Sequence, residues 1–207
     1  MSATNRKGGR GAGPDPAAPD GVPPDKLIPF LTAPSLAVRI LRAAGVGGLA
    51  FLVAWYVSYL FLPEGLLRAG PSGIGFSAAG GALTAAAVLA GNLLLRIRGL
   101  PAGYLAAAWG FLYAGVKAGT NSFLVPYAQR ITPTFRVFSR GMIYEMLAWA
   151  ILAAASCGWA RFELDRRGSG LRGASPKPTR EEVLAAAGGA LLTAAALALE
   201  AAGVLPA

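Results

Sequence analysis

The sequence predicts an all-α protein, a polytopic transmembrane helical bundle of about five spans with the N-terminus in and the C-terminus out. Three observations predict this fold. The mean hydropathy of the 207-residue chain is +0.51. Only 14% of its residues are charged, against about 25% in a typical soluble domain. The charges also gather in clusters between long uncharged runs, as membrane insertion requires.

The composition excludes several classes of protein. The chain has no His and one Cys, Cys157, so a disulfide framework is excluded and the commonest metal ligand and general base are missing. We expect no cofactor, no metal site and no enzymatic activity. The net charge of +9 would suit a nucleic-acid partner, but the basic residues follow no helical face, so we expect none.

The chain divides into a tail and a membrane domain. Residues 1–26 are rich in Gly, Pro and Asp, which predicts a disordered cytoplasmic tail because so few large apolar residues cannot offset the entropy of ordering. Residues 27–207 form the transmembrane domain, and its first part, 27–42, is expected to lie at the membrane interface.

Five apolar runs are long enough to cross about 30 Å of hydrocarbon, which takes roughly 20 helical residues. The third begins near Leu100, is uncharged to Val116 and has room to continue past Lys117. The five predicted spans are 43–62, 73–95, 100–116, 141–160 and 183–203.

The distribution of Lys and Arg predicts the orientation of the spans. With the N-terminus inside, 14 of the 19 basic residues lie in inside segments. This satisfies the positive-inside rule.

Small residues predict how the spans pack, because close approach of backbones at Gly and Ala faces replaces the hydrophobic driving force in lipid. We expect the second and fifth spans, with Gly80–Gly81 and Gly188–Gly189, to form the buried centre. The first span, with its larger side chains, is expected to face lipid. The four-residue turn 97–100 predicts that the second and third spans form a tight antiparallel hairpin.

Glu145 is the sharpest single signal of a buried polar site. A carboxylate within an apolar span costs about 2.5–3.5 kcal/mol on insertion scales, so it usually faces the bundle and finds a partner. Lys117 lies at a similar predicted depth and is the natural partner. The alternative is that Glu145 lies near enough to the interface to reach water.

Three further residues complete the predicted intramembrane polar network. Glu200 lies near the outer end of the fifth span, where it can pair or extend into water. Asn92 and Asn121 can hydrogen-bond across helices, which joins the helices or, less commonly, forms a transport site.

The outer segment 118–140 interleaves aromatic residues with Arg130, Arg136 and Arg140. This surface can rest on anionic lipid headgroups or dock an extracytoplasmic protein.

Two short strings have an ordinary interpretation. Gly70-Pro71-Ser72-Gly73 matches the G-x-S-G of intramembrane rhomboid serine proteases, but the chain has no His to activate Ser72, so we interpret the match as chance. Thr179-Arg180-Glu181-Glu182 predicts an N-cap with acids in the first turn of the fifth span.

Short motifs occur in a fixed order in the second half of the chain. They are Gly91-Asn92-Leu93, Thr120-Asn121-Ser122, Arg140-Gly141-Met142-Ile143-Tyr144-Glu145 with Ala148 and Ala153-Ala154-Ala155-Ser156-Cys157-Gly158, the basic loop 161–180, and Leu199-Glu200-Ala201-Ala202-Gly203-Val204-Leu205-Pro206. Over roughly residues 88–207 this set resembles the stage II sporulation protein M family of integral membrane proteins. Arg140 stands where the family has His, and one extra residue separates Gly141 from Glu145.

The resemblance implies a bacterial, multi-pass cell-membrane protein without enzymatic activity. It implies an anchor or scaffold for a cell-envelope complex of the peptidoglycan-remodelling type, with a cell-wall hydrolase as partner and the lipid bilayer around it. Two alternatives remain: a small permease-like transport subunit that uses Glu145 and Lys117, and an intramembrane hydrolase. The sequence does not predict an oligomeric state.

Overall fold

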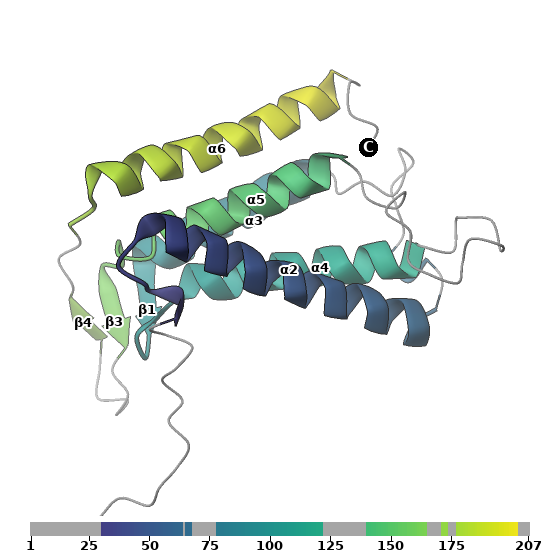
Figure 1. Ribbon diagram of the computed structural model, residues 1–207, viewed down its shortest axis with the longest axis horizontal. Coiled ribbons are helices and arrows are strands. Elements are labelled where there is room, and N and C mark those ends of the chain that lie inside the picture. Colours follow the sequence, from purple (N-terminus) through teal and green to yellow (C-terminus); the bar gives the residue numbers. More distant parts are fainter. Residues whose placement is uncertain are drawn as a thin grey trace, which may run out of the picture.

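The computed structural model describes residues 30–63, 65–67, 78–121, 140–164, 171–173 and 177–202. Within these residues the protein is mostly helical, with five long helices and a small sheet at one end of them (Figure 1). The expected disordered tail, 1–26, and most of the outer segment 118–140 lie outside the described residues. The helices are α2 (Leu36–Phe61), α3 (Ala78–Leu94), α4 (Ala102–Asn121), α5 (Arg140–Ala155) and α6 (Arg180–Ala201).

Each predicted span overlaps one of these helices, with shifted ends. Helix α2 begins at Leu36 and therefore includes part of the segment that was expected to lie at the interface. Helix α4 continues past Lys117 to Asn121. Helix α5 ends at Ala155, and a turn follows at 156–158, so the last residues of the predicted fourth span are not helical.

Two of the helices are long and apolar enough to cross a membrane by length and composition. They are Leu36–Phe61 and Arg180–Leu199, and two shorter apolar helices cover Gly80–Leu94 and Met142–Ala155.

The all-α prediction missed a four-stranded sheet of order β2-β1-β3-β4. Strand β1 pairs antiparallel with β2 and parallel with β3, and β3 pairs antiparallel with β4. The two-residue turn between β1 and β2 has positive φ at both Arg98 (52°) and Gly99 (87°), as a type I′ hairpin turn requires. The strands are β1 (Leu95–Ile97), β2 (Leu100–Pro101), β3 (Phe162–Leu164) and β4 (Leu171–Gly173).

The predicted hairpin of the second and third spans is confirmed. The β1–β2 turn joins α3 to α4, and the two helices pack with opposite directions. A Cβ atom built at Gly91 would lie 2.9 Å from the Gly103 nitrogen, near the joined ends, while one built at Gly110 would lie 2.6 Å from Thr84 Cγ2, further away.

The buried centre is formed by α4 and α5, so the prediction that the fifth span is central was wrong. Trp149 and Leu152 of α5 are fully buried, whereas Leu184 and Leu191 of α6 are 61% and 71% exposed. Figure 1 shows α6 along one side of the bundle. Small residues allow close helix packing, but they do not require it: Gly189 packs against Leu152, whereas a Cβ atom at Gly188 meets nothing within 4 Å. Their abundance in α6 therefore did not show which helix is surrounded.

Helix α2 presents one face to α4 and leaves the other exposed. The face against α4 carries small or deeply buried residues, which are Ala43, Gly47, Phe51, Ala54, Trp55 and Ser58. Its exposed face carries larger apolar side chains, which are Leu41, Val46, Leu49, Leu52, Val53, Tyr56, Val57, Leu60 and Phe61. One face of the first predicted span is therefore exposed and the other is packed, and the contact of the exposed face with lipid stays a prediction.

Glycines four residues apart allow α2 and α4 to approach at backbone distance. A Cβ atom at Gly115 would overlap the Phe51 carbonyl oxygen, and one at Gly119 would lie 2.5 Å from the Trp55 carbonyl oxygen and overlap Ser58 Oγ. Real Cβ atoms do not reach such positions, so the seam between α2 and α4 closes only because both residues lack a side chain.

We expect Gly119→Ala to destabilise the protein by about 1–3 kcal/mol, because the added methyl group must push α2 away from α4. Thermal unfolding in detergent measures this loss. The matched control is Gly188→Ala, where a Cβ atom meets nothing within 4 Å, so the better helix propensity of Ala should leave stability unchanged or raise it by up to about 1 kcal/mol. Equal effects of the two substitutions would contradict the close α2–α4 contact.

Candidate functional site

Glu145 lies buried between α5 and α3, with 3% of its surface exposed. Its carboxyl group lies against Gly81 of α3, where a Cβ atom would overlap it. One turn further along α5, the indole N–H of Trp149 donates a hydrogen bond of 3.0 Å to the Gly81 carbonyl oxygen. The missing side chain of Gly81 thus makes room for the Glu145 carboxyl group, and the Gly81 carbonyl oxygen binds the Trp149 indole. The pairing of Glu145 with Lys117 stays a prediction.

Hydrogen bonds at the end of α4 join this helix to the segment after α2. Asn121 Nδ2 donates to the Leu67 carbonyl oxygen at 2.8 Å and to the carbonyl oxygen of half-buried Lys117 at 2.7 Å. The Gly65 N–H donates to the Thr120 carbonyl oxygen at 2.8 Å. Asn121 therefore satisfies backbone groups where α4 ends.

Asn92 of α3 is fully buried and joins three elements. Its Nδ2 donates to the Ala153 carbonyl oxygen at 3.0 Å and to Ser156 Oγ at 2.9 Å, and its Oδ1 accepts from the Gly103 N–H at 2.7 Å. These bonds use both the donor and the acceptor side of the amide. Asn92 is a link between α3, α4 and α5.

For several of the candidate site residues predicted from the sequence, the structure describes no side chain. Arg130, Arg136 and Ser72 belong to segments that are not described. Arg140 is the first residue of α5 and Glu200 lies near the end of α6, but nothing is described of either side chain.

A buried ionic cluster, absent from the sequence-based prediction, lies at the sheet end of the bundle. Arg39 of α2 forms an ion pair of 2.7 Å with Glu182 of α6, and the two side chains are 9% and 11% exposed. A second guanidinium N–H donates to Cys157 Sγ at 2.7 Å. Three parts of the chain, the start of α2, the turn after α5 and the start of α6, thus meet at Arg39.

The local sequence of α6 places Glu182 for this contact. Thr179 and Glu182 form a capping box: the Thr179 N–H donates to Glu182 Oε2 at 3.0 Å, and the Glu182 N–H donates to Thr179 Oγ1 at 3.2 Å. The N-cap expected from the sequence is therefore present. Because the cap engages Oε2, the other carboxylate oxygen, Oε1, is directed at Arg39.

Cys157 is buried beyond the end of α5, and burial raises the pKa of its thiol above the ordinary value, although the guanidinium of Arg39 opposes that shift. Arg96 Nη2 donates to the Cys157 carbonyl oxygen at 3.1 Å and ties this turn to β1. The Cys157 sulfur serves as a weak hydrogen-bond acceptor for Arg39, whose charge is compensated by Glu182.

The arrangement is suited to holding helices together. A surface hollow of about 430 Å³ lies beside the ion pair, and its lining is Pro34, Leu36, Arg39, Thr179, Arg180, Glu181 and Glu182. Among the described residues, no group of three or more His, Cys, Asp or Glu side chains could hold a metal ion. The sequence indicated one member of the cluster, Glu182, as an acid in the first turn of α6. Its partner Arg39 lies 143 residues away in the chain, so the sequence did not indicate the pair.

We expect Arg39→Leu and Glu182→Leu each to cost about 3–5 kcal/mol, because each leaves one buried charge uncompensated. The double variant should be more stable than either single variant, since it buries no charge. Thermal unfolding in detergent measures all three. Glu181→Leu is the matched control: it removes an exposed acid from the same turn of α6, and it should change stability by no more than about 0.5 kcal/mol. Additive losses in the double variant would contradict the buried pair.

Comparison of the chain with models of protein families, with curated proteins and with solved structures finds no match.

Proposed function

We propose that this protein is a multi-pass membrane protein that acts as a non-enzymatic anchor or scaffold for a cell-envelope complex. The resemblance to the stage II sporulation protein M family, described above, is part of this proposal. The observation that carries it is the use of buried polar groups: Asn92, Trp149 and Arg39 each bond to a neighbouring helix or turn. Helices joined by such bonds suit a scaffold better than a transport path, because the polar groups bind neighbouring parts of the chain.

The exposed surface supports a membrane location for the helices. The exposed face of α2 carries nine large apolar side chains, a patch that a soluble monomer rarely exposes. Helices α3 and α5 have 17 and 16 residues and reach about 25 Å, near the lower limit for a span. With α4 they complete the proposed five spans.

The position of the basic residues supports the proposed orientation. Several arginines belong to elements at the sheet end of the bundle (Figure 1). They are Arg39, Arg42, Arg96, Arg98, Arg161 and Arg180. Under the positive-inside rule this end lies in the cytoplasm, so α2 starts inside and α6 ends outside.

The transport alternative would need a polar path through the bundle. The hollow beside Arg39 and an apolar cavity between α2 and α4 are both lined by residues other than Glu145 and Lys117. The described polar groups therefore favour the scaffold over the permease. The hydrolase alternative lacks the histidine base that a rhomboid-type serine protease uses, because the whole chain has no His.

The proposed topology can be tested by labelling single cysteines in intact cells, in a Cys157→Ser background. A membrane-impermeant thiol reagent should label the outer positions before permeabilisation and the inner ones only after it. The outer positions are Ala69, Arg130 and Pro206, and the inner ones are Asn5 and Gly170. Labelling of position 170 in intact cells would reject the orientation.

The partner surface can be tested by quantitative pull-down from detergent-solubilised membranes. The combined change of Arg130, Arg136 and Arg140 to Gln should lower recovery of a cell-wall hydrolase at least tenfold, because these cations would pair with its acidic groups. The matched control changes Arg161, Arg166 and Arg167 to Gln, which removes the same charge from the proposed inner loop and should leave recovery intact. Full recovery with the outer variant would reject this surface, and cleavage of peptidoglycan by the purified protein alone would reject the scaffold.

A further inference from the structure

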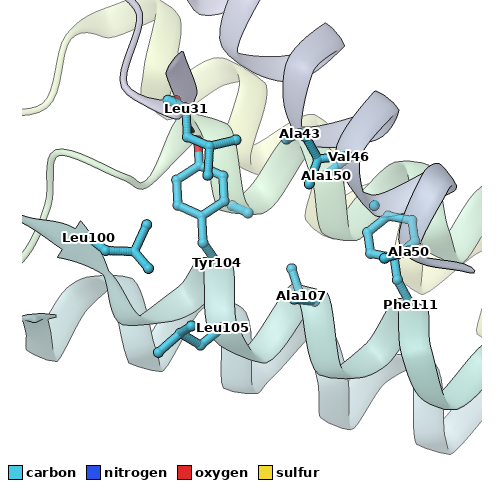
Figure 2. Close-up of a pocket in the computed structure, with 13 residues that line it drawn as sticks. Leu31, Ala43, Val46, Ala50, Leu100, Tyr104, Leu105, Ala107, Phe111 and Ala150 are labelled. Atoms are coloured by element: carbon cyan, nitrogen blue, oxygen red, sulfur yellow. Dashed lines mark hydrogen bonds between the residues drawn. The ribbon is translucent and has the colours of Figure 1, made fainter. Parts of the chain in front are cut away.

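An apolar cavity of about 140 Å³ lies in the seam between α2 and α4 (Figure 2). Its volume is similar to that of the engineered cavity of about 150 Å³ that binds benzene in another protein. Small residues on both helices leave this space: Ala43 and Ala50 on α2, and Ala107 and Ala108 on α4. Beyond Phe111, whose ring lies over Gly47, the seam is closed by Gly115 and Gly119.

The lining of the cavity offers an occupant only apolar contacts. The one polar side chain in it is that of Tyr104, and its hydroxyl group already donates to the Leu31 carbonyl oxygen at 3.0 Å. Figure 2 shows Leu31, Leu100 and Tyr104 at one end and Phe111 near Ala50 at the other. From Ala43 to Ala50 the cavity follows α2 for about 10 Å, which is within one leaflet of a core about 30 Å thick.

The cavity opens on the outer surface of the helices. Val46 and Leu105, which line it from opposite helices, are 41% and 50% exposed. If the helices lie in a bilayer, as proposed above, this opening faces hydrocarbon. An empty apolar space loses dispersion contacts on its walls, and an entering hydrocarbon chain restores them.

The end of the cavity nearest the sheet has positive charge. Arg42 directly precedes Ala43 of the lining, and its guanidinium lies 4.4 Å from the centre of the Phe30 ring while donating to the Phe30 carbonyl oxygen at 2.9 Å. Exposed Arg98 lies two residues before Leu100, which lines the same end. A guanidinium has five N–H donors, so Arg42 can bind a phosphate oxygen while it remains held by Phe30.

We infer that this seam binds one acyl chain of an anionic phospholipid, with the lipid phosphate beside Arg42 and Arg98. The inference rests on the proposed membrane location and goes beyond the scaffold role. The apolar lining selects the chain, and the two arginines select the anionic headgroup. The bound lipid would fill the part of the α2–α4 contact that glycine packing leaves open.

The test uses the full-length protein in phosphatidylcholine nanodiscs that contain a trace of phosphatidylglycerol with a diazirine in its acyl chain. After irradiation, adducts are mapped by peptide mass spectrometry. We expect them to concentrate at least fivefold on residues 43–50 and 104–111 relative to the exposed face of α6. Even labelling of all exposed helix faces would overturn the inference.

Two filling variants and one control test the cavity itself. Ala107→Leu and Ala108→Leu should each lower the adducts in the seam at least fivefold, while Ala87→Leu, on the exposed face of α3, should leave them unchanged. Cooperative thermal unfolding in detergent shows that a variant is folded. If either folded filling variant retains the seam adducts, the inference fails.

Headgroup selection is tested by competition with unlabelled lipids. Unlabelled phosphatidylglycerol should displace the probe about fivefold better than phosphatidylcholine. Arg42→Gln should remove most of this preference, and Arg161→Gln, an exposed arginine at the same end, should keep it. A preference that survives Arg42→Gln combined with Arg98→Gln would overturn the headgroup assignment.

Carbonate extraction separates the two proposals: a chain that leaves the membrane contradicts the membrane location, whereas an inserted chain with scattered adducts contradicts only the lipid site.

Discussion

The fold depends on how closely the neighbours of α4 can approach its backbone. Gly103 and Gly110 face α3, where Cβ atoms would overlap or crowd Asn92 and Thr84. Gly115 and Gly119 face α2. Because α4 has glycines on two of its faces, other helices can pack closely against both. In lipid, such close packing replaces the hydrophobic driving force that would assemble a soluble bundle.

Buried polar groups then fasten the helices that surround this centre. Trp149 binds α3 at Gly81, Asn92 binds α4 and α5, and the Arg39–Glu182 pair binds the start of α6 to the start of α2. The last contact matters most for α6, because much of that helix is exposed. Removing the pair would leave α6 attached mainly through small apolar contacts such as Gly189 against Leu152.

The seam between α2 and α4 shows how the same two helices can be closed at one end and open at the other. Glycine at 115 and 119 brings the backbones together, whereas alanine pairs further along leave a space that no large side chain fills. The cavity lies at the same end of the bundle as the ionic cluster and the sheet, so the proposed cytoplasmic end carries both the polar links and the proposed lipid site.

The sequence by itself determined the elements: five apolar segments that became helices, the turn that joins α3 to α4, the N-cap at Thr179 and the burial of an acid at Glu145. These features depend on local composition and short spacing. Tertiary structure alone decided that α4 and α5 are central, that Gly189 is packed while Gly188 is open, and that Arg39 meets Glu182 across 143 residues. The physical reason is that the helices of this chain carry apolar residues on both their packed and their exposed faces. Hydrophobicity, which marks the inner face in a soluble protein, therefore could not show which face is packed.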